Sequence, residues 1–158
     1  MYFTSPSKGQ VSFHDLFREL VEYTNEYPDD SYKLIIGTDS HTLINESVIF
    51  VTAVVVHRVG KGGRFYYHKQ KTHYMESLRQ RIYYETFLSL DVAARLTEQL
   101  AQNGEQQLNV EIHLDVGEKG ETRKIIKEVV GMVIGSGYQA CIKPDSYGAT
   151  TVADRYTK

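Results

Sequence analysis

The sequence of 158 residues contains one cysteine, three prolines and no tryptophan. A single cysteine, Cys141, excludes an intramolecular disulfide and the cysteine pairs of zinc fingers. No apolar run reaches the roughly 18 residues that a transmembrane helix needs. The first ten residues also lack the basic start and apolar stretch of a secretory signal. We therefore expect a cytoplasmic protein with no membrane partner.

Internal repeats, low-complexity tracts and proline-rich linkers are also absent from the sequence, which favours one domain over residues 1–158. Hydrophobic residues make up 41% of the chain and charged residues 24%. This balance is typical of a globular protein, and it supplies enough apolar surface for a core without a disulfide or a structural metal.

The net charge of −2 is too small for a generally basic nucleic-acid-binding protein, but the charges are unevenly distributed. Residues 58–81 hold seven Lys and Arg residues and one acidic residue, a net charge of about +6, whereas the rest of the chain carries about −8. This basic segment suits either an edge hairpin that resists aggregation or a phosphate-binding surface. Its tyrosines suit base stacking and protein interfaces equally.

Hydrophobic periodicity predicts an α/β fold. A helix is expected after Ser12, which has the side chain of an N-cap. Apolar segments then predict three antiparallel strands, over residues 33–39, 47–57 and 64–72. Further elements are expected in the order helix 74–103, strand 108–115, helix 121–134, strand 138–142 and helix 150–158. Together they predict a mixed five-stranded sheet, with helices on its faces and one extra N-terminal helix.

Two of these strands end on a carboxylate, Asp39 and Asp115. Strand ends are where α/β sheets commonly hold their sites, although Asp39 would also suit a turn. On the long helix, a step of about 100° per residue places Glu85 at the edge of the apolar face. Burial of Glu85 is costly unless it binds a metal or pairs with a nearby arginine, Arg79 or Arg81.

Asp154, in the last predicted helix, would by itself suit a helix-capping role beside Thr151. However, the order of Asp39, Glu85, Asp115 and Asp154 after three meander strands resembles the ribonuclease H-like fold. Three segments carry a narrower resemblance: Ile-Ile-Gly-Thr-Asp-Ser-His, Leu-Asp-Val-Gly-Glu-Lys-Gly-Glu-Thr-Arg and Lys-Pro-Asp-Ser-Tyr-Gly-Ala-Thr-Thr-Val-Ala-Asp. They resemble the bacterial YkuK family, a ribonuclease H-like group of uncertain function, and the similarity covers nearly the whole chain.

In ribonuclease H-like proteins the matching carboxylates bind two divalent metal ions for phosphodiester hydrolysis. The resemblance therefore implies that Asp39, Glu85, Asp115 and Asp154 hold Mg²⁺ or Mn²⁺, with Asp39 as the bridging ligand. Such hard cations prefer carboxylate oxygens, and two of them about 3.5–4 Å apart can stabilise both the attacking and the leaving oxygen. We predict a metal-dependent nuclease that acts on RNA or DNA.

Contacts with substrate are expected from residues near these carboxylates and from the basic segment: Ser40, His41, Lys69, Lys71, Lys119 and Arg123. The alternative is a catalytically silent module on the same fold, which binds nucleic acid or another protein. The sequence does not distinguish RNA from DNA, and it leaves association into a homo-oligomer open.

Overall fold

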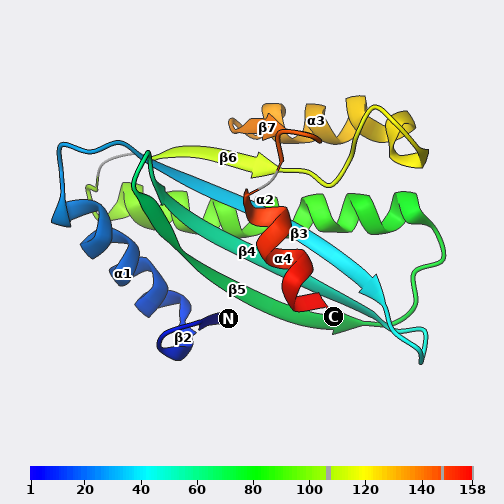
Figure 1. Ribbon diagram of the computed structural model, residues 1–158, viewed down its shortest axis with the longest axis horizontal. Helices are drawn as coiled ribbons and strands as arrows, with labels where there is room; N and C mark the ends of the chain where they lie inside the picture. The colour runs from blue at the N-terminus through cyan, green and yellow to red at the C-terminus, as the bar shows by residue number, and fades with distance from the viewer. Residues whose placement is uncertain (106–107, 147, 158) are drawn as a thin grey trace.

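The computed structural model of the chain describes residues 1–105, 108–146 and 148–157 (Figure 1). Its strands within these ranges form one seven-stranded sheet in the order β2-β1-β5-β4-β3-β6-β7. An antiparallel meander occupies the middle of the sheet and consists of β3 (Tyr32–Thr42), β4 (Val48–Arg58) and β5 (Gly62–Thr72). Next to β3, the parallel strands β6 (Asn109–His113) and β7 (Gln139–Cys141) extend the sheet. The predicted mixed α/β architecture is thereby confirmed.

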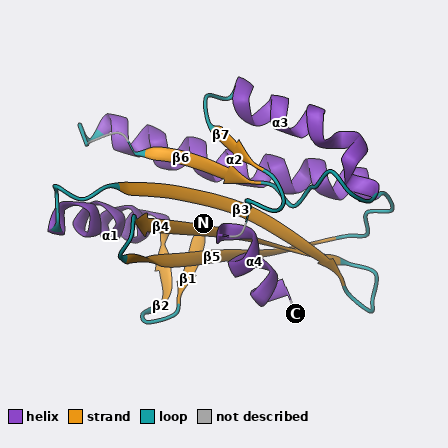
Figure 2. Cartoon of the chain, turned by 45° about the horizontal axis from the view of Figure 1, so that its top comes forward, coloured by secondary structure: helices purple, strands orange, loops and turns teal. Residues whose placement is uncertain are grey.

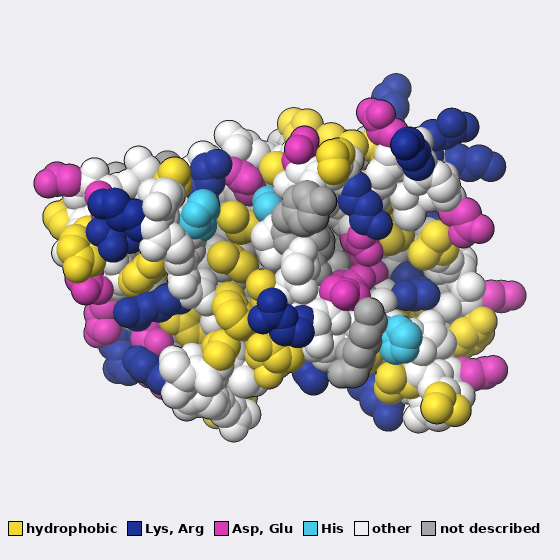
Figure 3. Space-filling view, in the orientation of Figure 1, with side chains coloured by type: hydrophobic (Ala, Val, Ile, Leu, Met, Phe, Trp, Pro, Cys, Tyr) yellow, Lys and Arg dark blue, Asp and Glu magenta, His cyan; other side chains and the backbone are white. Residues whose placement is uncertain are grey.

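Helices cover both faces of this sheet (Figure 2). Helices α1 (Phe13–Glu26), α2 (Leu78–Gln102) and α3 (Ile126–Gly135) share the larger apolar core with one face. Helix α4 (Gly148–Thr157) lies on the other face, over β3, β4 and β5, where a smaller group of apolar residues forms a second core. Figure 3 looks onto this α4 face and shows acidic side chains gathered near its middle. Across the described residues, no helix has the length and apolar character needed to cross a bilayer.

Three helices differ at their beginnings from the sequence-based expectation, and one of them, α4, begins at Gly148 instead of residue 150. Ser12 caps α1 as predicted, since its hydroxyl accepts a hydrogen bond from the Asp15 amide at 3.1 Å. Helix α2 begins only at Leu78, because Ser77 accepts from the Gln80 amide and so caps the helix there. The predicted helix 121–134 is divided into a 3₁₀ turn, η1 (Glu121–Ile125), and the α-helix α3; such turns are common at helix termini.

An N-terminal hairpin enlarges the sheet beyond the predicted five strands. It consists of β1 (Tyr2–Ser5) and β2 (Gly9–Ser12), and β1 joins the sheet beside β5. Phe3 and Val11 of the hairpin are buried in the larger core. Each strand has four residues, which is too short for an alternating pattern to stand out in the sequence.

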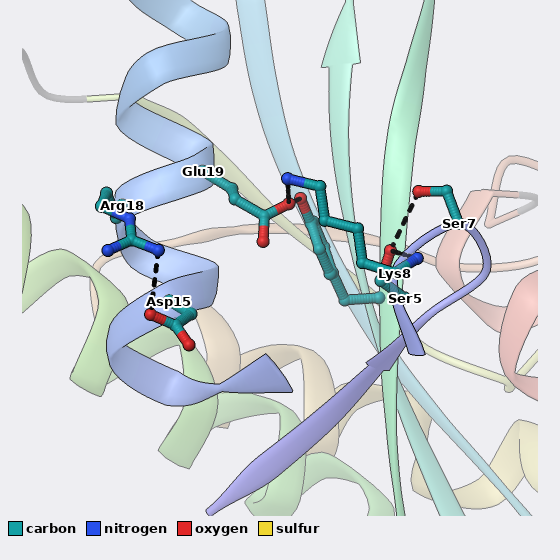
Figure 4. A network of polar contacts seen from close by, with 7 residues as sticks. Ser5, Ser7, Lys8, Asp15, Arg18 and Glu19 are labelled. Atoms are coloured by element: carbon teal, nitrogen blue, oxygen red, sulfur yellow. Dashed lines mark hydrogen bonds and ion pairs between the residues drawn. The ribbon is translucent and has the colours of Figure 1, made fainter. Parts of the chain in front are cut away.

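A polar network fixes this hairpin to α1 and β5 (Figure 4). Glu19 of α1 is 5% exposed, and its Oε1 lies 3.3 Å from Lys8 Nζ in the hairpin turn. The same oxygen accepts a hydrogen bond from the Tyr66 hydroxyl at 3.0 Å. Burial and the neighbouring Glu19 carboxylate raise the pKa of Tyr66, so it remains a donor. This buried carboxylate is therefore satisfied by two partners from different elements.

Candidate functional site

Asp39 and Asp115 lie side by side at one edge of the parallel strand pair. Strands β3 and β6 are paired with Gly37 opposite His113, which places Asp39 and Asp115 at corresponding positions two residues further on. The prediction that β3 ends at Asp39 was wrong, because antiparallel pairing with β4 extends it to Thr42. Strand β6 ends at His113, so Asp115 lies just beyond it. Both carboxylates are thus at the carboxyl edge of the parallel pair.

Glu85 approaches this pair from α2, on the opposite face of the sheet. Its side chain is buried, and one carboxylate oxygen from each of Asp39, Glu85 and Asp115 lies within 4.8 Å of the other two. The Ser40 hydroxyl donates to Glu85 Oε2 at 2.5 Å, and Arg81 Nε donates to the same hydroxyl at 3.1 Å. Glu85 is thereby linked to Arg81 through Ser40.

The alternative expected for Glu85 was a direct salt bridge to Arg79 or Arg81. The structure shows instead that Ser40 lies between Glu85 and Arg81. Arg79 instead pairs with Glu128 of α3 at 2.7 Å. Ser40 itself is 7% exposed and faces α2, because alternation along β3 turns it away from Asp39. Its burial argues against the predicted contact with substrate, and its hydrogen bonds indicate that it positions Glu85.

Asp154 reaches the same site from α4. Together with Asp39 and Asp115 it lines an open cleft of about 510 Å³, whose other walls are Lys143, Pro144, Ser146 and Thr151. The carboxyl groups of Asp39 and Asp154 share a hydrogen bond. The cleft lies on the α4 face of the molecule, where acidic and basic side chains are close together (Figure 3). The structure thus brings all four predicted carboxylates to one place, with Asp154 at the exposed rim.

The electrostatics of this cluster favour a bound cation. Burial, the charge of Asp115 and the hydrogen bond with Asp154 raise the pKa of Asp39 to about 7. Burial raises the pKa of Glu85 well above its usual range, against the lowering effect of Ser40; Asp39 and Asp115 raise it further. Carboxylates this close cannot all ionise without cost unless positive charge lies between them.

Among the cleft residues that sequence patterns did not predict, the basic residue Lys143 contacts one of the carboxylates directly. Lys143 Nζ lies 2.7 Å from Asp115 Oδ1, and this hydrogen bond raises the pKa of Lys143 despite partial burial. His113 and Cys141 are paired in the register of β6 and β7, so Lys143 follows β7 as Asp115 follows β6. Lys143 opens the third of the YkuK-like segments, but its approach to Asp115 depends on a strand register that local patterns do not reveal.

The predicted basic contacts divide into two groups. Across β4, the strand register aligns Asp39 with Lys69 and His41 with Lys71. Lys69, Lys71 and His41 are exposed, and by alternation they lie on the same face as Asp39. Neighbouring strands are spaced about 4.8 Å apart, so Lys69 lies roughly 10 Å from Asp39 across the sheet. Lys119 and Arg123 are exposed on the segment that follows Asp115.

A second group of side chains of the types that can bind a metal, Glu111, His113 and Cys141, lies on β6 and β7. Glu111 Oε1 is 3.3 Å from His113 Nε2 and 3.5 Å from Cys141 Sγ. Lys33 Nζ lies 3.0 Å from Glu111 Oε2. Burial alone would raise the pKa of Glu111. Hydrogen bonds from Lys33, His113 and Cys141 outweigh this effect and lower the pKa of Glu111. Lys33 therefore supplies the charge that a metal would otherwise supply, and the group ties β7 and β6 to β3.

Comparisons with known proteins agree with this architecture. The family model described as Ribonuclease H-like matches residues 15–158, which leaves the N-terminal hairpin outside the match. The uncharacterized protein YkuK of Bacillus subtilis (strain 168) is 36% identical over 170 aligned positions, covering 99% of this chain and 96% of that protein. No solved structure matches the chain. With the meander, the crossover units and the order of carboxylates, these matches show that the chain belongs to the YkuK group of the ribonuclease H-like family.

Proposed function

We propose that this protein is a divalent-metal-dependent phosphodiester hydrolase that acts on RNA or DNA at the carboxylate cleft. The observation that carries the proposal is the convergence of Asp39, Glu85 and Asp115 to within 4.8 Å of one another. Asp154 borders the same cleft. Membership of the ribonuclease H-like family supports the same chemistry, because its characteristic carboxylates bind divalent metals.

The donor set fits Mg²⁺ or Mn²⁺. The converging ligand atoms are carboxylate oxygens, the donors that hard divalent cations prefer. Asp39 interacts with both Asp115 and Asp154, which suits a bridging ligand of a two-ion site. Glu85 and Asp115 would complete one coordination shell and Asp154 the other.

When bound, the divalent ions supply a Lewis acid for the phosphoryl oxygens and for the attacking water. The protein supplies the positioning. Asp39 is held by antiparallel pairing with Val51 of β4, two residues beyond the end of the parallel pairing with β6, and the Arg81–Ser40 pair orients the Glu85 carboxylate. The cleft is open to solvent beside α4, so a polymer backbone can pass along it. Rigid placement of this kind lowers the barrier, since reacting groups need no further ordering.

The face that carries Asp39 also supports a path for nucleic acid. Clustered carboxylates repel phosphates, so a nuclease needs positive charge nearby to hold its substrate. Lys69 and Lys71 of β5 lie on this face, separated from the Asp39 row by β4. We propose that they contact the substrate backbone beside the cleft, with His41 at its rim.

Cleavage assays on single- and double-stranded RNA and DNA, in Mn²⁺ and in Mg²⁺, test the proposed activity. The wild type should cleave at least one substrate class. Loss of a residue that only supports a metal ligand can reduce activity by roughly 100-fold. Asp39 is proposed as a direct ligand, so Asp39→Asn should reduce the cleavage rate by at least that factor. Glu98→Gln, on the exposed side of α2, is the matched control and should retain full activity. Equal cleavage by the wild type and Asp39→Asn would assign the activity to a contaminant.

A catalytically silent nucleic-acid-binding module is the second candidate. It is favoured by the basic face of β5, which can bind a phosphate backbone without any chemistry at the carboxylates. Binding of nucleic acid without cleavage in either metal would support this module over the hydrolase.

A further inference from the structure

Lys143 holds a fixed place in the carboxylate cleft. Its backbone amide donates to the Val116 carbonyl at 2.9 Å, and the Leu114 amide donates to the Cys141 carbonyl at 2.9 Å. These bonds lay the segment after β7 along the segment after β6. These backbone hydrogen bonds anchor Lys143 beside Asp115. The lysine therefore stays near Asp115 even without the ion pair, in which Nζ lies 2.7 Å from Oδ1.

Gly117 makes room for the stem of this lysine. A Cβ at Gly117 would lie 3.3 Å from Lys143 Cβ and 3.6 Å from Lys143 Cδ, the first of which is closer than most real contacts of this kind. The lysine side chain therefore runs over a bare stretch of backbone towards Asp115. A side chain at position 117 would require the stem of Lys143 to shift by a few tenths of an ångström.

The ion pair between Lys143 and Asp115 is exposed enough to exchange. The side chains are 57% and 30% exposed, respectively, and ion pairs open to water are weak. A divalent ion binds carboxylate oxygens at about 2.0–2.6 Å and would repel an ammonium on the same oxygen. Occupation of Asp115 by a metal should therefore release Lys143 Nζ, while the backbone anchor keeps it at the cleft.

We propose that Lys143 is a substrate-binding residue with a different partner in each state of the cleft. In the metal-free protein its ammonium neutralises Asp115. Once a divalent ion has taken the place of that ammonium at Asp115, Lys143 binds a phosphate of the nucleic acid. This inference rests on the proposed function. A released ammonium has three donors on a flexible stem, and a phosphodiester is the anion that the proposed substrate brings into the cleft. Lys143 thus contributes positive charge to the cleft in both states.

Titration of Mn²⁺, followed by electron paramagnetic resonance of the free ion, tests the first half of this exchange. Lys143→Met should bind Mn²⁺ about three- to tenfold more tightly than the wild type, because a competing cation has been removed. Lys143→Arg keeps the charge and should stay near the wild type. Lys127→Met is the matched control, since this exposed lysine lies on α3 at the other face of the sheet, and the Mn²⁺ affinity of this variant should equal that of the wild type.

Binding of short RNA and DNA in Ca²⁺ tests the second half. Lys143→Met should weaken binding several-fold and reduce the slope of log affinity against log salt by roughly 0.7–0.9, the effect of removing one phosphate-binding cation. An unchanged slope would overturn the substrate role, and unchanged Mn²⁺ affinity would overturn the exchange. Both outcomes leave the proposed hydrolase intact if Asp39→Asn still weakens Mn²⁺ binding. Mn²⁺ binding that is insensitive to both Asp39→Asn and Lys143→Met would contradict the hydrolase as well.

Discussion

At the scale of single residues, Asp39 has an environment in the cleft that opposes its ionisation. Its pKa of about 7 lies well above the ordinary value of 3.8, because of burial, Asp115 and Asp154. Between these two values the native protein keeps a proton that the unfolded chain has released. The free energy of unfolding of the metal-free protein should therefore decrease as the pH rises from about 4 to about 7.

Asp39→Asn should reduce this pH dependence, and the raised pKa of Glu85 accounts for the part that remains. At about pH 8 in the presence of a chelator, the variant should be more stable than the wild type by about 1–2 kcal/mol, allowing for solvent screening of a partly exposed group. At about pH 4 the two proteins should have nearly equal stability, since Asp39 is then protonated in the native state. Urea unfolding at both pH values measures the difference.

Asp29→Asn is the control for a general change in charge, because Asp29 is exposed in the turn before β3. It should change the stability little at either pH. A uniform destabilisation of Asp39→Asn at both pH values would show that the carboxyl group is structurally required rather than electrostatically unfavourable.

At the scale of elements, α4 completes the cleft, and a small interface holds it in place. Ala149 and Ala153 pack on Ile35, Val51 and Ala53. At its C-terminal end, the Tyr156 ring stacks on Tyr67 of β5, with ring centroids 3.8 Å apart and an angle of 14° between the planes. The position of Asp154 over the cleft thus depends on a few apolar side chains and on the contacts of Tyr156 with Tyr67 and Phe65 of β5.

Tyr156→Ala should loosen α4. We expect a loss of about 1–3 kcal/mol in the free energy of unfolding, together with weaker Mn²⁺ binding, as the Asp154 carboxylate is less well placed. Tyr156→Phe preserves the stacked ring and should match the wild type in both measurements. If Tyr156→Ala lost stability but bound Mn²⁺ with unchanged affinity, Asp154 would not be a ligand.

Strand β5 makes a separate contribution to the α4 face. If Lys69 and Lys71 bind the substrate backbone, their combined replacement by Gln should lower the slope of log affinity against log salt by roughly 0.7–0.9 for each phosphate that the variant no longer binds. Binding of short RNA and DNA at several salt concentrations gives this slope. Lys127→Gln, on α3 at the other face of the sheet, is the control. A slope identical to the wild type would exclude β5 from the binding surface.

At the scale of the whole molecule, the carboxylate cleft exists only when the chain is folded. Its four carboxylates come from β3, α2, the segment after β6 and α4, which are distant in the sequence. An unfolded chain would not hold them together, so a cation that binds the cleft stabilises the native state alone. Metal affinity and global stability are therefore coupled.

Mn²⁺ should raise the melting temperature of the wild type. At a concentration of about one hundred times the dissociation constant, the added stability is about 2.7 kcal/mol. Asp39→Asn should show little or no shift, although it melts higher than the wild type without metal at neutral pH. Thermal unfolding with and without Mn²⁺ measures both effects; equal shifts in the two proteins would place the metal elsewhere.

Most of the architecture was predictable from local patterns. The meander strands, the long helix and the Ser12 cap each leave a periodic or capping signal within a few residues. The hairpin Tyr2–Ser12 was not predicted, because short strands give too few repeats. Ser40 was predicted to contact the substrate. The alternation of side chains along β3 already places Ser40 and Asp39 on opposite faces of the sheet, so the sequence contained the signal against that prediction.

The sequence by itself determined the order of elements after the N-terminal hairpin, the family resemblance and the four candidate carboxylates, because these depend on local periodicity and motifs. Only the tertiary structure decided which groups meet. The register of β3, β6 and β7 brings Asp39, Asp115 and Lys143 together, and helix packing turns Glu85 and Asp154 toward them. Pairing between distant strands is selected by the packing of the complete core, so no local pattern contains the contact between Lys143 and Asp115.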